Sequence, residues 1–518
     1  MDNLIQILLT LLLGYVLWVI VTTLWRYNTL CRTVKDFAQL APAHWFWGHM
    51  KLGYMSDMRL LFDLPREEAY RINHNKKWSI FWMSFIPMIQ ATHPDSAKAV
   101  LKLSDPKPTG RGQVYNVLID FIGDGLVTSN GKKWERNRKL LTPAFHFDVL
   151  RPYVRIYNEA ADIVLDKFAT MMKESPKSID ITDVLNLATL DVILRCALSY
   201  EGNIQRQEKH PYAMAVQRIG SLIMSRMTYP WQFLSWTLYM MSADGQEYKR
   251  HLDYVHGFAD DLIAKRKKAL TEDSSLLEGK HRLDFLDILM TAKDESGVGL
   301  TDQEIRDEVD TFLFAGHDTT FTALRWALYN FGKYPDEQDK VYREVCDVMG
   351  DQKYTEWEDL GKLQKLTMFM KESMRLYPPV TSSTRLLKQP LELDGVSLPA
   401  GTSVTVAMIG VHYHPDVYPD FNVFRPERFL PENSEDRDPY AFIPFSAGLR
   451  NCIGQNFSMN EQKVMLSRIL KRFKVVLDED HEVIPIPELT LRPKTGIKIR
   501  FEERDNNQNN IRGEIEKE

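Results

Sequence analysis

The chain has 518 residues, 44% of them hydrophobic, which is enough to bury a large core. Its formal net charge of −5 lacks the basic excess typical of nucleic-acid binding, so we expect no nucleic-acid partner. Its four cysteines, Cys31, Cys196, Cys346 and Cys452, are too scattered for a zinc motif or a small disulfide framework. The first three are therefore predicted to be free thiols in a reducing compartment.

The first segment is apolar and long enough to cross a membrane. Residues 3–25 carry no charge, and about 20 residues of helix span a bilayer. The alternative is a cleaved signal peptide, but the apolar run is longer than a typical signal core and no basic segment precedes it. Arg26, Arg32 and Lys35 follow, so the positive-inside rule places the rest of the chain in the cytosol. We expect a single-pass membrane anchor over residues 1–25.

Residues 26–50 follow the anchor as a linker. They contain Pro42 and the aromatic run His-Trp-Phe-Trp-Gly-His at positions 44–49. Aromatic rings of this kind lie at a bilayer surface or pack on a folded domain, and the sequence leaves both options open. One large domain then covers residues 51–502, and a polar tail covers residues 503–518.

Helical patterns dominate the domain. Residues 129–267 are predicted to be mostly helical, and residues 271–282 to form a mobile surface loop. A long helix is predicted to begin at Thr301, where Thr-x-x-Glu spacing fits a capping box, and to end near Lys333. Alternating residues between positions 391 and 410 predict short strands with turns.

The long helix contains the run Ala-Gly-His-Asp-Thr-Thr at positions 315–320. Helical spacing places Ala315, Asp318 and Thr319 on one face and His317 on another. The glycine and hydroxyl groups in this run can loosen a helix locally, as at a π-bulge or a water-filled kink. An alternative is an ordinary helix surface with an Asp-Thr pair.

A pair of opposite charges lies in an apolar stretch farther on. Glu372 and Arg375 are three residues apart on one helix face. Such pairs are usually solvated and weak, but the neighbouring Met, Phe and Leu residues favour burial. Arg428, in a Pro-Glu-Arg-Phe run, supplies another cation.

The run Phe-Ser-Ala-Gly-Leu-Arg-Asn-Cys-Ile-Gly at positions 445–454 carries the strongest signal. Glycine permits close backbone approach to a flat group, and Arg450 lies two residues from the Cys452 thiol. The alternative is a buried structural cysteine. Phe445, Gly448, Arg450, Cys452 and Gly454 together resemble the haem signature of the cytochrome P-450 superfamily.

That resemblance implies a mainly α fold with small β-sheets, the cytochrome P-450 fold, preceded here by one N-terminal transmembrane helix. It implies haem b ligated through iron by Cys452, with Trp134, Arg138 and Arg385 near the propionates. It also assigns proton delivery and oxygen activation to Asp318 and Thr319. The superfamily's buried structural triad corresponds to Glu372, Arg375 and Arg428.

Further motifs resemble family 4 of this superfamily, which hydroxylates fatty acids and eicosanoids near the methyl end. They are residues 46–49, 141–147 and 316–320, and residues 244–246 and 284–316 look most like its leukotriene and long-chain fatty-acid subgroup. Many members have a glutamate, esterified to haem, where this chain has Ala315. We therefore expect non-covalent haem.

The resemblance also implies a substrate pocket, lined by Val114, Tyr115, Phe121, Phe312, Val380, Thr381 and Leu489. The implied partners are O₂, a lipid substrate and NADPH-cytochrome reductase, with cytochrome b5 as a further candidate, at the endoplasmic reticulum membrane. A basic run over residues 132–139 could meet an acidic electron donor or be a solvated helix face. Alternative functions are hydroxylation of a sterol or xenobiotic, a reductase-independent rearrangement, and a non-catalytic haem or lipid carrier.

Overall fold

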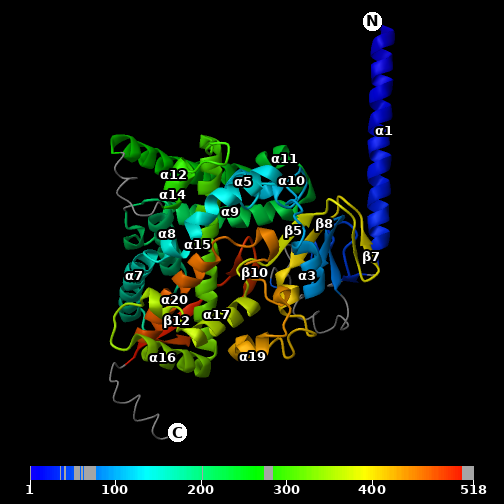
Figure 1. Ribbon diagram of the computed structural model, residues 1–518. Coiled ribbons are helices and arrows are strands. Elements are labelled where there is room, and N and C mark those ends of the chain that lie inside the picture. The colour runs from blue at the N-terminus through cyan, green and yellow to red at the C-terminus, as the bar shows by residue number, and fades with distance from the viewer. Residues whose placement is uncertain are drawn as a thin grey trace.

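A computed structural model describes residues 2–35, 37–39, 42–51, 59, 62, 77–200, 202–273 and 284–504. Most of these residues are helical, as the sequence predicts (Figure 1). The longer helices are α1 (Asp2–Thr33), α5 (Gly131–Leu141), α7 (Tyr153–Glu174), α8 (Thr182–Ala197), α9 (Pro211–Thr228), α12 (Ala243–Glu272), α15 (Asp302–Lys333), α16 (Pro335–Met349), α17 (Gln364–Leu376) and α20 (Gln455–Arg472).

Short helices connect these long ones. They are α3 (Pro94–Leu101), α4 (Asn116–Ile122), α6 (Phe147–Leu150), α10 (Pro230–Leu234), α11 (Trp236–Met240), α14 (Phe285–Thr291), α18 (Met408–His412) and α19 (Pro431–Ser434). Several begin with a proline in the first turn, where its fixed φ fits and its missing N–H is not needed.

The strands form small sheets at the edge of the helical body. The largest has the order β1-β2-β3-β8-β5, and β4-β12-β9 form another. The pairs β6-β7 and β10-β11 are two-stranded and antiparallel. Their bounds are β1 (Ala38–Gln39), β2 (Trp78–Met83), β3 (Ile86–Ala91), β4 (Ile179–Asp180), β5 (Ser382–Leu386), β6 (Leu391–Leu393), β7 (Val396–Leu398), β8 (Ser403–Ala407), β9 (Phe473–Leu477), β10 (Pro485–Pro487), β11 (Leu491–Pro493) and β12 (Lys498–Glu503).

Helix α15 runs through the middle of the molecule and packs against α8, α17, α20 and β9 (Figure 1). The Thr301 hydroxyl accepts from the Glu304 N–H at 3.2 Å, and the Glu304 carboxylate accepts from the Thr301 N–H at 2.9 Å. The predicted capping box and helix end are therefore confirmed. A Cβ on Gly316 would lie 2.7 Å from Ile193 Cδ1, so this glycine lets α8 approach α15 closely.

The predicted strands between positions 391 and 410 are confirmed as β6, β7 and β8, although the last residues form α18 instead. The β6–β7 turn uses Asp394 and Gly395, both with positive φ. In the predicted loop over residues 271–282, α12 continues to Glu272, and positions 274–282 lie outside the described residues. Of the predicted tail, residues 505–518 also lie outside them.

Helix α1 projects from the body of the domain and continues to Thr33, beyond the predicted end of the anchor (Figure 1). Its last turns approach β7, and the Tyr27 hydroxyl donates to the Phe85 carbonyl at 3.0 Å. Within the described part of the chain, no helix has both the length and the apolar character needed to cross a membrane.

The two tryptophans of the aromatic run in the linker have different surroundings. Trp47 packs edge-on against Trp231, with ring centroids 5.8 Å apart. Trp45 instead is 86% exposed. One ring therefore packs on the domain while another remains available to a surface.

Candidate functional site

A cavity of about 280 Å³ lies between α15 and the loop that carries Cys452. Ala315, Gly316 and Thr319 line it from the helix, and Phe445, Arg450, Cys452 and Gly454 line it from the loop. The opposing walls come from segments more than a hundred residues apart in the sequence.

The geometry of the cysteine loop depends on two residues with positive φ. Ser446 has φ 57°, and Gly448 has φ 71°. A Cβ on Gly448 would lie 2.2 Å from the Leu101 carbonyl oxygen, so no larger residue fits there. Gly448 is absent from the residues that line the cavity within the described chain, so its role differs from the predicted cofactor approach: it seats the loop against α3.

Cys452 opens onto the cavity. Its backbone N–H donates to the Phe445 carbonyl at 2.9 Å, which closes the loop. Burial raises the pKa of the Cys452 thiol, whereas the Gly454 backbone N–H and the Arg138 cation favour the thiolate. A bound metal cation would shift the balance strongly to the thiolate.

Helix α15 is assigned as α-helix throughout its described residues, so the possible π-bulge is not seen there. The Thr319 hydroxyl donates to the Ala315 carbonyl at 2.6 Å, one turn earlier. His317 faces away, as predicted: it is fully buried beside Asn186, and burial lowers its pKa to about 4.

Asp318 does not share the cavity face of Ala315 and Thr319, which corrects the predicted common face. Its carboxylate is fully buried and accepts from the Thr490 hydroxyl at 2.7 Å and from Arg492 at 3.2 Å. Residues three apart on a helix differ by about 60° in direction, which is enough to send one side chain to the cavity and the other to the β10–β11 turn.

A group of cations surrounds one side of the cavity. Arg450 donates to the Asn130 side chain at 3.0 Å and lies 4.7 Å from the Trp134 ring centre. Arg138 donates twice to Asn451, at 2.9 Å each. Trp134 and Arg138 also line the cavity, as expected for one face of a helix.

Two further cations of this group lie deeper. Lys107 is buried and donates to the Tyr115 and Ser383 hydroxyls at 2.7 and 2.9 Å. Arg385 is 1% exposed, lies behind the residues that line the cavity and donates to Ser383 at 2.9 Å. Among the described residues, its Nε and Nη2 atoms have no hydrogen-bond partner. Burial and neighbouring arginines hold the pKa of Lys107 well below its usual value.

Lys107 was missed by sequence reasoning. It lies in no recognised motif, and only the fold brings it beside Arg385 and Arg450. A lysine between prolines at 106 and 108 is a weak signal, because most lysines are exposed.

The paired charges of the predicted triad are confirmed as a buried group. Arg375 donates to both carboxylate oxygens of Glu372 at 2.7 and 2.8 Å, and both residues are fully buried. Arg428 Nε lies 3.5 Å from the Glu372 carboxylate, and its Nη1 and Nη2 atoms donate to the backbone carbonyls of positions 419 and 420. The Glu372 carboxylate also accepts from the Arg425 N–H at 2.9 Å, which fixes the chain near Arg428.

Comparison with known proteins identifies the fold. The profile of the family described as Cytochrome P450 matches residues 39–501. The chain belongs to the cytochrome P450 family. It is 38% identical to Cytochrome P450 4F6 of Rattus norvegicus over 504 residues, covering 95% of this chain and 92% of that protein.

Two other family-4 relatives carry names that state an activity. The chain is 37% identical over 481 residues to the Ultra-long-chain fatty acid omega-hydroxylase of Homo sapiens, covering 91% of this chain and 89% of that protein. It is 36% identical over 505 residues to Leukotriene-B4 omega-hydroxylase 3 of Mus musculus, covering 95% of each. Cytochrome P450 enzymes are monooxygenases that use a thiolate-ligated haem, O₂ and a redox partner.

The cavity fits that cofactor. Haem needs a thiolate on one face, and Cys452 supplies it. Its propionates need cations, and Arg385 presents two buried donor atoms without a protein partner. Within the described residues, no carboxylate lies within ion-pair distance of Lys107, Arg385 or Arg450. Buried unpaired cations beside an open cavity are explained by an anionic ligand.

The predicted substrate residues divide into two sets. Tyr115, Phe312 and Val380 line the cavity. Within the described residues, Val114, Phe121, Thr381 and Leu489 are not part of that lining. Phe121 instead packs against Phe314 with ring centroids 5.1 Å apart.

Three basic residues of the run on α5 form ion pairs with carboxylates of the same protein. Arg136 pairs with Asp294 at 2.9 Å and Glu304 at 3.0 Å. Lys133 pairs with Asp124 at 2.8 Å, and Lys139 pairs with Glu295. These contacts favour the alternative of a solvated helix face over a free cationic patch.

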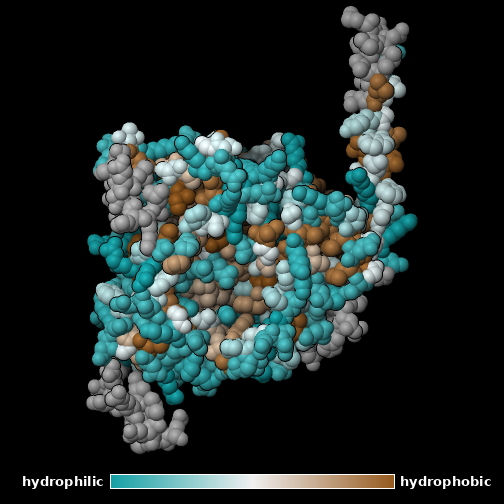
Figure 2. Space-filling model, in the orientation of Figure 1, coloured by the Kyte–Doolittle hydropathy of each residue, from teal (hydrophilic) through white to brown (hydrophobic). Residues whose placement is uncertain are grey.

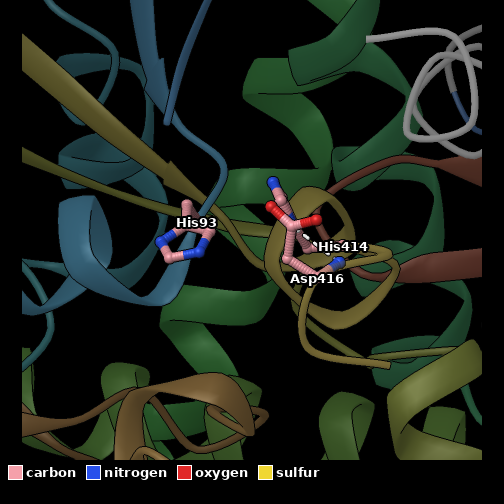
Figure 3. A group of neighbouring side chains, drawn as sticks. All are labelled: His93, His414 and Asp416. Carbon is pink, nitrogen blue, oxygen red and sulfur yellow. Dashed lines mark hydrogen bonds and ion pairs between the residues drawn. The ribbon is translucent and has the colours of Figure 1, made fainter. Parts of the chain in front are cut away.

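A separate cluster of His93, His414 and Asp416 has ligand atoms within 4.8 Å of one another (Figure 3). The His93 Nδ1 atom accepts from the Asp95 N–H at 3.1 Å and caps α3. The His414 Nδ1 atom accepts from the Asp416 N–H at 3.3 Å. Because each Nδ1 lone pair is already used, the neutral rings carry their proton on Nε2, and the cluster is better explained as paired helix and turn caps.

Proposed function

We propose that this cytochrome P450 hydroxylates long-chain fatty acids or eicosanoid-like lipids at or near the methyl end. The observation that carries the proposal is the position of Thr319 and Cys452 on opposing walls of one largely apolar cavity. The names of two family-4 relatives, a fatty-acid and a leukotriene omega-hydroxylase, support a lipid substrate. An alkyl end suits such a lining, because most ligand pockets bind through apolar contact.

The cofactor would be held at both its iron and its propionates. Cys452 would ligate iron, with Phe445, Gly454 and the seated Gly448 shaping the loop. Trp134, Arg138, Arg385, Arg450 and Lys107 would meet the propionates through charge-assisted hydrogen bonds. When bound, haem supplies oxygen activation and accepts the electrons. Overall, one lipid substrate, one O₂, one NADPH and one proton would yield one hydroxylated lipid, one water and NADP⁺.

The protein's own contribution is positioning and proton supply. Thr319 would hold a hydroxyl proton at the cavity wall, and Asp318 would supply protons behind it. Tyr115, Phe312 and Val380 would contact the reacting end of the lipid. Val114, Phe121, Thr381 and Leu489 would act farther along the substrate path.

Ala315 would leave the haem attached without a covalent bond. Its methyl group lines the cavity and offers no carboxylate for an ester. The haem hold then depends on Cys452 and the cations. Freedom of the haem plane would also relax the selection of the terminal methyl over neighbouring carbons.

We place the enzyme at the endoplasmic reticulum membrane, with residues 1–25 as a single anchor and the catalytic domain in the cytosol. Residues 26–50 would be the linker, 51–502 the haem domain and 503–518 the tail. Hydrophobic residues along α1 are visible in Figure 2, and Leu13 and Trp18 are 69% and 63% exposed. The exposed rings and aliphatic side chains of Trp45, Trp231, Leu238 and Met241 support a second contact with lipid.

NADPH-cytochrome reductase would supply electrons, and cytochrome b5 is a further candidate donor. The test uses the full chain with the reductase in phospholipid vesicles. Fatty acids of increasing length, an eicosanoid, a sterol and an apolar drug-like compound are offered in parallel. We expect NADPH-dependent hydroxylation of a fatty acid or the eicosanoid near its methyl end.

Other outcomes would separate the alternatives. Oxidation of the sterol or drug-like compound alone would assign a different monooxygenase substrate. Product without reductase would indicate a rearranging enzyme. Lipid binding without O₂ consumption would indicate a carrier. The variant Thr319→Ala is expected to divert electrons to peroxide, whereas Thr319→Ser should keep most coupling.

A further inference from the structure

The Asp318 carboxylate is held outside the cavity lining, against the β10–β11 segment. Both of its oxygens are occupied: Oδ2 accepts from Thr490 at 2.7 Å and Oδ1 accepts from Arg492 at 3.2 Å. Thr490 lies in the turn between β10 and β11, and Arg492 lies in β11. A carboxylate that supplies protons to the cavity must therefore leave, or share, these two contacts.

Arg492 also reaches α9. Its Nη1 atom donates to the Gln217 carbonyl at 3.2 Å and lies 3.4 Å from the Glu488 carboxylate. The Ser221 hydroxyl donates to the same Glu488 carboxylate at 3.2 Å. One guanidinium thus connects α15, the β10–β11 segment and α9.

The fit of Arg492 against α9 is close. A Cβ on Gly220 would lie 3.5 Å from Arg492 Nη2, so the guanidinium packs directly against the helix backbone. Arg492 has a side-chain exposure of 12%, and Asp318 has none. Partial burial strengthens such a charge pair relative to one on the surface.

The other charged groups near Asp318 do not replace Arg492. His317 is neutral at physiological pH, since burial lowers its pKa to about 4. Arg325 donates to the Leu491 carbonyl and the Thr322 hydroxyl instead. Although burial raises the pKa of Asp318, Arg492 and the hydrogen bond from Thr490 bring it below its usual value.

We propose that Arg492 is the positioning residue for Asp318, and that through Glu488 and the Gln217 carbonyl it couples this carboxylate to α9. This inference rests on the proposed function. A shift of α9 would move the guanidinium that holds the carboxylate.

The first test is a double-mutant cycle on the fraction of NADPH electrons that appear as hydroxylated product. Arg492→Gln should lower that fraction at least threefold. In an Asp318→Asn background, the same change should have no further effect, because its target is gone. Arg500→Gln, which removes an exposed arginine of β12, is the matched control and should match the wild type.

A purely structural role of Arg492 predicts a different result. Its loss would then lower coupling equally in both backgrounds, and that outcome would overturn the proposal. Arg492→Lys sharpens the distinction. One ammonium can pair with Asp318 but cannot also reach Glu488 and the Gln217 carbonyl. The fraction of electrons that appear as product should therefore recover, whereas the contact with α9 should remain lost.

The second test needs no substrate or turnover. Hydrogen–deuterium exchange of the haem-loaded protein reports the opening of α9. We expect at least threefold faster exchange in the second half of α9 in Arg492→Gln and Arg492→Lys, but not in Arg500→Gln. Unchanged exchange in both Arg492 variants would refute the connection to α9.

These readouts keep two failures apart. If no lipid is hydroxylated, the proposed function fails, while the exchange experiment still decides whether Arg492 connects to α9. If lipid is hydroxylated but the cycle shows no interaction between Arg492 and Asp318, the positioning role alone is wrong.

Discussion

Two groups of buried arginines in this protein have opposite surroundings. Arg375 donates from Nε and Nη2 to the two carboxylate oxygens of Glu372, and from Nη1 to the His412 carbonyl at 3.0 Å. Arg385 is equally buried but meets only a hydroxyl and a backbone carbonyl, and two of its donor atoms have no partner. The hydrogen-bonding capacity of the guanidinium is therefore used in Arg375 and only partly used in Arg385.

The difference separates charges that build the fold from charges that bind a ligand. A buried cation without an anion is costly, so the fold does not create one without compensation. The Glu372 carboxylate compensates Arg375 and Arg428. Lys107 and Arg450 line the cavity instead, and Arg385 lies behind Ser383 of that lining, where the haem propionates would compensate these cations.

The largest expected effect comes from breaking the paired group. Glu372→Gln leaves two buried guanidinium groups without their shared carboxylate. Removing one partner of a buried ion pair costs about 3–5 kcal/mol, so we expect little or no folded, haem-loaded protein. Expression yield and haem content measure this. The matched change at an exposed pair, Glu247→Gln beside Arg218, should leave both unchanged.

Glu308 is a buried acidic residue that can be compared with the buried arginines. It is fully buried and accepts from the Leu126 N–H and the Asn137 side chain, and among the described residues no cation forms an ion pair with it. Burial raises the pKa of Glu308 to about 7. The folded protein therefore holds this proton more tightly than the unfolded chain does.

A raised carboxyl pKa contributes stability that is present below the unfolded value, near 4.5, and is lost as the pH rises through about 7. The shift corresponds to a change on the order of 3 kcal/mol. Glu308→Gln should flatten the pH dependence of the melting temperature between pH 5 and pH 8. An identical pH dependence in both proteins would show that Glu308 ionises normally.

The next largest effect is expected from replacing Arg385. Arg385→Gln should weaken haem binding by about 1.5–3 kcal/mol, the worth of a hydrogen bond to a charged group. Without haem, the variant should be no less stable than the wild type, because an unpaired buried cation has been removed. Melting temperatures of the apo and haem-loaded forms measure both. Equal destabilisation of the two forms would assign Arg385 to the fold.

The smallest effect concerns Ala315. Wild-type haem should be fully extractable into acidified organic solvent. Ala315→Glu should yield a fraction of covalently bound haem after turnover and shift hydroxylation toward the terminal carbon. Mass spectrometry and product chromatography measure these outcomes. Covalent haem in the wild type would contradict the account of Ala315.

Much of the site follows from local sequence pattern. The cysteine loop, the Glu372–Arg375 pair and the capped α15 depend on spacings of three to nine residues, which one helix or turn fixes. The family resemblance then supplied the fold. Patterns of this range determine which residues lie together locally.

The rest depends on contacts between distant segments. Asp318 was predicted to share the cavity face, but its carboxylate binds Thr490 and Arg492, more than 170 positions away, outside the cavity lining. Lys107 joins the cations only because Ser383 of β5 lies beside it. Gly448 is required by Leu101 on α3 rather than by the cofactor. No helical or strand period encodes these contacts.

The carbon monoxide spectrum of the reduced protein tests the central claim most directly, because only thiolate-ligated haem gives its characteristic absorption band. The wild type and Cys346→Ser, which removes a half-buried thiol of α16, should both show the full band. Cys452→Ser should lose the band entirely. A normal band in Cys452→Ser, or its loss in Cys346→Ser alone, would contradict the assignment of Cys452 as the haem ligand.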